Sequence, residues 1–215
     1  MGELSSDLHQ SARLVLTLRR AGVTANKVLQ AMEDTPRSWF VDPEYQSLAS
    51  EDAALPIACG QTSLRPSLTG MLLQMADIRD DTESVLLVGA GSGFTAALLS
   101  QMVKRVYAVE RYKSLVNFAS EAFKTREIEG IELLHGDGLL GWDANAPYDR
   151  IIVTGLVEEK LTSLLLQMAH GGCLIQPVTG DSGQKIQVLD KSGNQLNSLD
   201  VTGFSALTPG TSLEL

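Results

Sequence analysis

Residues 84–94, SVLLVGAGSGF, place a short apolar run directly before three alternating glycines. The apolar run predicts a buried strand, and the residues after the glycines predict a helix. Glycine lets a backbone approach a ligand closely, and the first turn of a helix offers unpaired N–H groups. A dinucleotide-binding fold would need a third glycine at position 94, where the chain has Phe94. The pattern therefore favours an adenosyl ligand without a pyrophosphate.

Strand-like and helix-like segments alternate on both sides of this stretch. Further strands are expected at 105–110, 131–138, 148–155, 171–178, 184–191 and 198–207, and helices at 67–78, 94–103, 112–128 and about 158–169. This alternation predicts an α/β fold with a mainly parallel twisted sheet and helices on both faces. The closely spaced late strands predict an antiparallel finish.

Two helices are expected before the sheet. The first covers residues 3–21 and ends at Gly22, and the second is capped by Thr24 and ends at Pro36. Residues 38–66 then form a long connection without a sustained period. Connections of this length in a compact domain are usually functional.

Composition limits the classes of partner. The chain has 215 residues and a formal net charge of −9, and its lysines and arginines do not cluster. Nucleic acid and anionic membranes select basic patches, so neither is expected as a partner. The start is not that of a secretory signal, and no apolar run reaches membrane-spanning length. The two cysteines predict free thiols in a reducing cytoplasm rather than a disulfide framework.

Two acidic residues stand where successive strands of the unit end. Glu110 ends the strand at 105–110, where a carboxylate can accept both hydroxyls of a ribose. Asp137 follows the next strand, where a carboxylate can accept from an adenine amino group beside the Gly138 backbone. Ligands of open α/β sheets lie beyond the carboxyl ends of the strands. Together with the glycine-rich turn, these residues predict a nucleoside site.

Conventional catalytic machinery is scarce. The three histidines are scattered, and only His135 lies near the predicted site, where a structural role is the simpler interpretation. No metal-ligand spacing, nucleophile elbow or P-loop lysine occurs. Methyl transfer to a carboxylate accounts for this scarcity. The sulfonium methyl group is already activated and the carboxylate is already ionised at neutral pH, so positioning suffices.

An ordered set of motifs resembles the protein-L-isoaspartate O-methyltransferase family. The matching segments are residues 28–42, 51–62, 86–100, 106–111, 135–138, 146–154, 171–178 and 204–208. The resemblance implies a class I S-adenosylmethionine-dependent methyltransferase fold with added N-terminal helices. It also implies one domain over 1–215, with helices and a substrate-side loop in 1–66 and the cofactor-binding sheet in 67–215.

The family reaction is transfer of a methyl group from S-adenosylmethionine to the carboxylate of L-isoaspartyl residues. The ester then collapses to a succinimide, which reopens partly to normal aspartyl, and in this way damaged proteins are repaired. The resemblance implies that isoaspartyl proteins or peptides are the substrates. It assigns the methionine end of the cofactor to Gly89, Ala90, Gly91, Ser92 and Gly93.

The same resemblance assigns the rest of the site. Glu110 is implied to hold the ribose, and Asp137 with Gly138 to read the adenine. Thr62 and Thr208 match positions that close over cofactor and substrate.

One loop departs from the family pattern. The family reads GQTIS-P where residues 60–66 read GQTSLRP, so the family serine falls on Leu64 and Ser63 comes one residue early. In an extended segment this shift turns a side chain to the opposite face. Ser63 and Thr62 are the candidate catalytic residues, and Arg65 could grip a carboxylate. Ala58 replaces a frequent glycine, which predicts an altered loop path.

Three alternatives therefore stay open at this stage. The scaffold could methylate another carboxylate, or it could bind the cofactor without turnover. A nicotinamide dehydrogenase is disfavoured by Phe94. The sequence does not set the oligomeric state.

Overall fold

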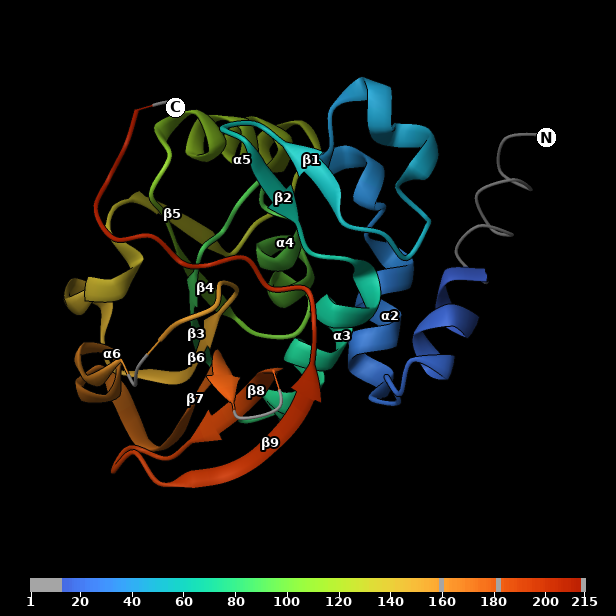
Figure 1. The fold of residues 1–215 in the computed structure, drawn as a ribbon. Coiled ribbons are helices and arrows are strands. Elements are labelled where there is room, and N and C mark those ends of the chain that lie inside the picture. Colours follow the sequence, from blue (N-terminus) through green and yellow to red (C-terminus); the bar gives the residue numbers. More distant parts are fainter. Residues whose placement is uncertain (1–12, 159–160, 181–182, 214–215) are drawn as a thin grey trace.

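A seven-stranded sheet organises the protein in a computed structural model that describes residues 13–158, 161–180 and 183–213 (Figure 1). Its order is β5-β4-β3-β6-β7-β8-β9. The strands are β3 (Ser84–Val88), β4 (Arg105–Glu110), β5 (Ile131–His135), β6 (Tyr148–Val153), β7 (Met168–Gly180), β8 (Gly183–Leu189) and β9 (Gln195–Val201). Strands β3 to β7 pair in parallel, and β8 and β9 add antiparallel pairs. The predicted α/β architecture, a mainly parallel sheet with an antiparallel finish, is confirmed.

Helices cover the sheet unequally. Residues 13–20 are helical, and the named helices are α2 (Asn26–Asp34), α3 (Pro66–Met75), α4 (Phe94–Ser100), α5 (Lys113–Thr125) and α6 (Thr162–Leu166). One apolar cluster joins α2, α3, α4 and α5 to one face of the sheet. A smaller cluster joins α6 to the other face. The central strand β3 lies between them, and all five of its residues are buried.

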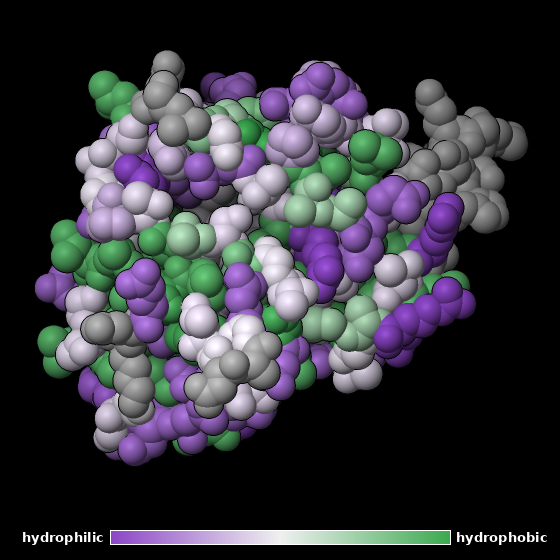
Figure 2. All heavy atoms as spheres, in the orientation of Figure 1, coloured by the Kyte–Doolittle hydropathy of each residue, from purple (hydrophilic) through white to green (hydrophobic). Residues whose placement is uncertain are grey.

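Four short 3-10 helices complete the described elements. They are η1 (Arg37–Phe40), η2 (Pro43–Leu48), η3 (Gly138–Leu140) and η4 (Asp143–Asn145). Figure 2 shows hydrophobic side chains gathered over η3 and α6, where Leu140 and Leu166 are 68% and 77% exposed. Within the described ranges, no helix is long and apolar enough to cross a membrane.

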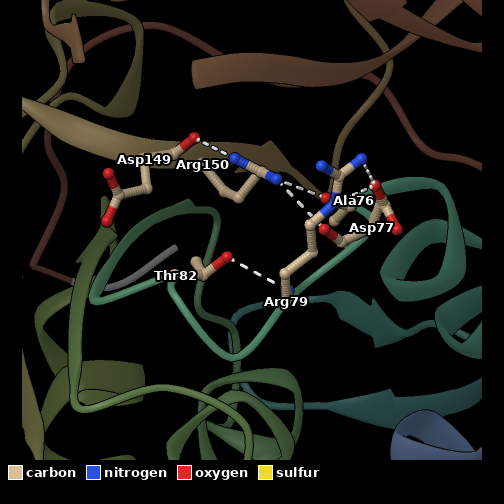
Figure 3. Close-up of polar contacts among 6 residues, drawn as sticks. All are labelled: Ala76, Asp77, Arg79, Thr82, Asp149 and Arg150. Atoms are coloured by element: carbon tan, nitrogen blue, oxygen red, sulfur yellow. Dashed lines mark hydrogen bonds and ion pairs between the residues drawn. The ribbon is translucent and has the colours of Figure 1, made fainter. Parts of the chain in front are cut away.

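Charged residues hold the chain together at the amino-terminal ends of β3 and β6 (Figure 3). The Asp149 carboxylate accepts the N–H groups of Glu83 and Ser84 at 2.9 and 3.0 Å. The Arg150 guanidinium donates to the carbonyls of Ala76 and Asp77 at 2.6 and 3.0 Å. These contacts tie the start of β6 to the loop that leads into β3, so this polar pair serves the scaffold.

The N-terminal segment corrects one expectation. The end of the first helix at Gly22 is confirmed, because Gly22 has φ +95° and its N–H donates to Arg19. Of the predicted range 3–21, residues 3–12 lie outside the described residues. Thr24 does not cap α2, which begins at Asn26 without a side-chain cap. The Thr24 N–H donates instead to the Gln74 side chain on α3, so a tertiary contact replaces the local cap.

Two late elements differ from the predicted bounds. Helix α6 is shorter than the predicted 158–169, because Met168 already pairs with Tyr148 as part of β7. Strand β9 covers 195–201 rather than 198–207. The Gln184 side-chain oxygen accepts the N–H groups of Gly203 and Phe204, and these bonds replace strand pairing. The following residues leave the sheet and cross the strand ends (Figure 1).

The predicted connection 38–66 contains a hairpin that periodicity does not reveal. Its strands are β1 (Leu55–Ile57) and β2 (Gln61–Ser63). The turn residues Cys59 and Gly60 have φ values of 60° and 61°, which is the geometry of a type I′ turn. The positions of this loop that require a positive φ are therefore 59 and 60. Ala58 is not among the positive-φ residues, and the expectation that it alters the loop path relative to the family stays a prediction.

The end of α5 offers a stabilising substitution. Glu127 has φ 54°, and the N–H of the next residue, Ile128, donates to Phe123, as in a Schellman motif. Glycine adopts this conformation without the cost that a side chain incurs. We expect Glu127→Gly to raise the free energy of unfolding by about 1 kcal/mol, which is a rise of about 2–4 °C in Tm. Calorimetry measures it.

The matched control is Glu129→Gly, at an exposed glutamate two residues on that lacks a positive φ. At this position glycine relieves no backbone strain, and it makes the unfolded chain more flexible. The free energy of unfolding should therefore fall slightly or stay unchanged. Equal responses of the two variants would contradict the strain that we assign to Glu127.

Candidate functional site

An open cavity lies beyond the carboxyl ends of β3, β4 and β6. It has a volume of about 130 Å³ and lies between the glycine-rich turn, the β1–β2 hairpin and the segment 203–208. Ligands of doubly wound sheets bind at this edge, where the strand order reverses.

Most residues of the glycine-rich turn line the cavity, and one serves helix packing. Gly89, Ala90, Gly91 and Ser92 line the cavity. A Cβ on Gly89 would lie 2.4 Å from the Thr154 hydroxyl oxygen, so only glycine fits there. Gly93 is not among the lining residues.

Gly93 instead serves the packing of two helices. A Cβ there would lie 2.8 Å from the Phe123 ring, so its absence lets α4 and α5 pack closely. Gly93 also has φ +101° at the N-cap position of α4. The structure thus brings four of the five predicted loop residues to the cavity.

Glu110 places a buried carboxylate in the cavity wall. Its side chain is 5% exposed, and its two oxygens accept the N–H groups of Gly91 at 2.8 Å and Tyr112 at 3.0 Å. Each carboxylate oxygen can accept a second bond. The residue can therefore hold the glycine-rich turn and still accept hydroxyl groups from a ligand.

The Glu110 carboxylate also predicts how ligand binding depends on pH. Burial raises the pKa of Glu110 above its usual range, although the N–H bonds from Tyr112 and Gly91 oppose the shift. A protonated carboxyl accepts hydroxyl groups poorly. We expect the affinity for S-adenosylhomocysteine to fall as the pH drops from 7.5 to 5, a loss that begins at higher pH than an exposed glutamate, with a pKa of about 4.3, would give.

Isothermal calorimetry across this pH range tests the expectation. In Glu110→Gln the ionisable group is gone, so the remaining affinity should not vary with pH. A wild-type affinity that stays constant down to pH 5 would contradict the role given to the carboxylate.

Asp137 has partners that the sequence does not indicate. One oxygen accepts the N–H of Leu139 at 3.0 Å, and the other accepts the N–H of Gly210 at 2.7 Å. Asp137 is not among the cavity-lining residues, whereas Gly138 is. The carboxylate thus fastens the segment after residue 208 to the end of β5. Its contact with adenine stays a prediction.

The hairpin and the C-terminal segment supply the opposite wall. Thr62, Ser63 and Leu64 line the cavity from one side, and Thr208 lines it from the other. The expectation that the side chains of Ser63 and Leu64 point to opposite faces stays a prediction, although both residues line the cavity. Strand β2 ends at Ser63, so its alternation does not extend to Leu64. Arg65, which precedes α3, is not among the lining residues.

Several functional residues escaped the sequence reasoning. Arg37 is only 3% exposed and donates to the Ala53 carbonyl, the Ser63 hydroxyl and the Leu64 carbonyl. Thr154 lines the cavity at the end of β6 and donates to the Gly89 carbonyl at 2.6 Å. A threonine directly after an apolar strand was a usable signal for Thr154. No local pattern indicates the contacts of Arg37.

His135 does not line the cavity. Its Nε2 lies 2.9 Å from the Arg111 carbonyl and 3.0 Å from that of Ser212, which fixes the C-terminal segment. The structural interpretation of this histidine therefore agrees with its contacts. Cys59 and Cys173 are free thiols, as expected.

Comparisons with known proteins point to one family. Residues 9–212 match the family model described as Protein-L-isoaspartate(D-aspartate) O-methyltransferase (PCMT). The chain is 38% identical over 219 residues to a Protein-L-isoaspartate O-methyltransferase of Xanthobacter autotrophicus, covering 100% of this chain and 99% of the relative. It is 42% identical over 170 residues to another of Rhodospirillum centenum, covering 79% and 76%.

Solved structures show the same similarity. A protein-L-isoaspartate O-methyltransferase structure aligns with a TM-score of 0.78 at 28% identity, covering 91% of this chain and 65% of that one. A Plasmodium falciparum structure, titled as a putative enzyme of this kind in complex with S-adenosyl-L-homocysteine, also has a TM-score of 0.78. It is 21% identical and covers 91% of this chain and 97% of that one, which shows the shared fold.

Proposed function

The chain belongs to the protein-L-isoaspartate O-methyltransferase family, a family of S-adenosylmethionine-dependent carboxyl methyltransferases, and on this premise we propose how its cavity divides between cofactor and substrate. The cofactor lies along Gly89, Ala90, Gly91 and Ser92, with its ribose on Glu110. The isoaspartyl carboxylate approaches between the hairpin and the segment 203–208. The observation that carries this division is the buried Glu110 carboxylate in the cavity wall, bonded to Gly91.

The residues present fit an adenosyl cofactor. Gly91 has no neighbour closer than 3.4 Å to where its Cβ would lie, so the backbone there is open to a ligand. Glu110 has free acceptor capacity for two hydroxyls. Thr62 and Thr208 both line the cavity, and in this proposal they close over both ligands. Asp137 and Gly138 stand at the adenine end, and Gly93 supports the turn from behind.

The chemistry asks little of the protein. S-adenosylmethionine, when bound, supplies a methyl group activated by its sulfonium. An isoaspartyl carboxylate is ionised at neutral pH, so no side chain has to remove a proton. The walls align the two groups and exclude water. Within the described residues, no group of histidine, cysteine and acidic side chains could hold a metal ion.

The sheet and the N-terminal segment act as one methyltransferase domain over 1–215, with the boundary near residue 66. Support comes from the larger apolar cluster, which joins Leu18 and Phe40 from the first part to Leu72 and Val85 from the second. Residues 1–66 supply the substrate-side loop. Isoaspartyl proteins or peptides are the substrates, and the reducing cytoplasm is the compartment suggested by two free thiols.

The alternative of another acceptor rested on Leu64 and Arg65, and the alternative of cofactor binding without turnover rested on Leu64. Loss of the family serine left open another carboxylate acceptor or cofactor binding without turnover. Ser63 lines the same cavity as Leu64, so a hydroxyl is still present at this wall. The match to protein-L-isoaspartate O-methyltransferases along nearly the whole chain favours the isoaspartyl acceptor over both alternatives.

Transfer of labelled methyl from S-adenosylmethionine to a matched pair of peptides tests the proposal. One peptide carries an isoaspartyl residue, and its control carries aspartyl in the same sequence. We expect the isoaspartyl peptide to be labelled selectively. No transfer to either peptide, with S-adenosylhomocysteine binding intact, would refute isoaspartyl methylation as the activity of this cavity.

A further inference from the structure

Arg37 puts a buried positive charge behind the substrate-side wall. It belongs to η1 and is 3% exposed, and none of the described carboxylates lies within 4 Å of its guanidinium. Burial lowers the pKa of Arg37 to about 10, and the more distant Asp52 opposes this shift. A buried charge without a close counter-ion is costly, so such residues are kept where the charge is used.

Most hydrogen bonds of Arg37 go to the loop of residues 60–66, which departs from the family pattern. One terminal nitrogen donates to the Ser63 hydroxyl at 2.8 Å and to the Leu64 carbonyl at 3.0 Å. The other donates to the Ala53 carbonyl at 2.9 Å. Ser63 and Leu64 line the cavity, whereas Arg37 does not. The guanidinium therefore acts on the cavity through the residues in front of it.

The bond from Arg37 changes what Ser63 can do. Since the Ser63 oxygen accepts from a cation, its own hydrogen is the group left to donate, and polarisation by the cation strengthens that donor. Its present acceptor is the Leu64 carbonyl at 3.3 Å. This distance is well beyond the usual 2.7–2.8 Å for such bonds, so a carboxylate can replace the carbonyl at little cost.

We propose that Ser63 donates to the substrate carboxylate in place of the hydroxyl that Leu64 lacks, and that Arg37 is the positioning residue that holds Ser63 for this purpose. The inference rests on the proposed isoaspartyl methylation and deepens it. The hydroxyl holds one carboxylate oxygen, which leaves the other free to form the new C–O bond as the C–S bond of the cofactor breaks. The Arg37 charge favours the anionic substrate at this wall.

Ser63→Ala tests the first half. We expect kcat for the isoaspartyl peptide to fall about tenfold, with S-adenosylhomocysteine affinity and Tm unchanged, because one positioning hydrogen bond is lost. The double variant Ser63→Ala with Leu64→Ser restores a hydroxyl at the family position and should recover most of the lost rate. Ser198→Ala, at an exposed serine of β9, is the matched control and should keep the wild-type rate.

Arg37→Met and Arg37→Lys test the second half. If Arg37 acts through Ser63, Arg37→Met should lower kcat about as much as Ser63→Ala, and the two changes together should not multiply. Arg37→Lys keeps the charge and a donor, so its rate should lie between those of wild type and Arg37→Met. Arg105→Met, at the far end of β4 from Glu110, is the control, and Tm of each variant reports its stability.

The outcomes separate this inference from the proposed function. Absence of isoaspartyl methylation by the wild-type protein would refute both. A wild-type protein that is active, with Ser63→Ala equally active, would overturn the role of Ser63 alone. Fully multiplicative losses in Ser63→Ala and Arg37→Met combined would overturn the coupling between the two residues.

Discussion

Glu110→Ala is expected to weaken the binding of S-adenosylhomocysteine at least about 100-fold. Two ribose hydroxyls would each lose a bond to a charged acceptor, and such bonds contribute about 1.5–3 kcal/mol each. The change also strips the Gly91 and Tyr112 N–H groups of their acceptor, so the glycine-rich turn loses its support. Isothermal calorimetry with S-adenosylhomocysteine measures the loss directly.

Glu110→Gln separates charge from shape. The amide keeps one acceptor but turns an NH₂ group toward a backbone N–H, because both glutamate oxygens accept such groups. We therefore expect a loss of affinity even in this isosteric variant. Glu121→Ala, at an exposed position of α5, is the control and should bind as the wild type does. A dissociation constant of folded Glu110→Ala within threefold of wild type would refute the assignment of the ribose to this residue.

The cofactor side of the cavity could be predicted because its signals are local. The strand, turn and helix around residues 84–100 are contiguous, and each has its own periodicity. Glu110 and Asp137 were placed by one rule, that successive parallel strands end at the same edge. The rule brings Glu110 to the cavity but does not reveal that Asp137 bonds to Gly210, 73 residues away.

The substrate side was less predictable because long-range contacts create it. Arg37 and Ser63 are 26 residues apart, and their bond depends on a hairpin whose three-residue strands are too short to show a period. The prediction that Thr24 caps a helix was wrong for the same reason, because Thr24 bonds to the remote Gln74 side chain instead. Where a residue's partner is remote in sequence, propensity identifies the residue type and the fold decides its use.

The predicted bounds of the last strand were wrong for a further reason. Residues 198–207 have strand-like composition, yet pairing ends at Val201 because the Gln184 side chain takes over the next N–H groups. The chain is thereby released to cross the cavity and present Thr208. The position of a site residue such as Thr208 depends on where the preceding strand ends, and sequence periodicity predicts strand ends poorly.

Gln176 carries the last prediction, an increase in stability. It lies in β7 between Leu174 and Val178, which belong to the apolar cluster on the α6 side of the sheet. Alternate residues of a strand share a face, so the Gln176 side chain points into this cluster. It is 0% exposed, and neither its amide nitrogen nor its amide oxygen has a hydrogen-bond partner. Burying such a group unpaired costs about 1–3 kcal/mol.

Gln176→Met is expected to raise the free energy of unfolding by about 2 kcal/mol, because methionine follows the same unbranched path without polar atoms. In a chain of this size, each kcal/mol raises Tm by about 2–4 °C, so scanning calorimetry would resolve the gain. Gln195→Met, at an exposed glutamine of β9, is the matched control and should change stability by less than about 0.5 kcal/mol. Gln176 does not line the cavity, so the gain should leave S-adenosylhomocysteine affinity unchanged. A destabilised Gln176→Met would instead show that the amide has partners in solution, and would remove the argument that this buried position lacks them.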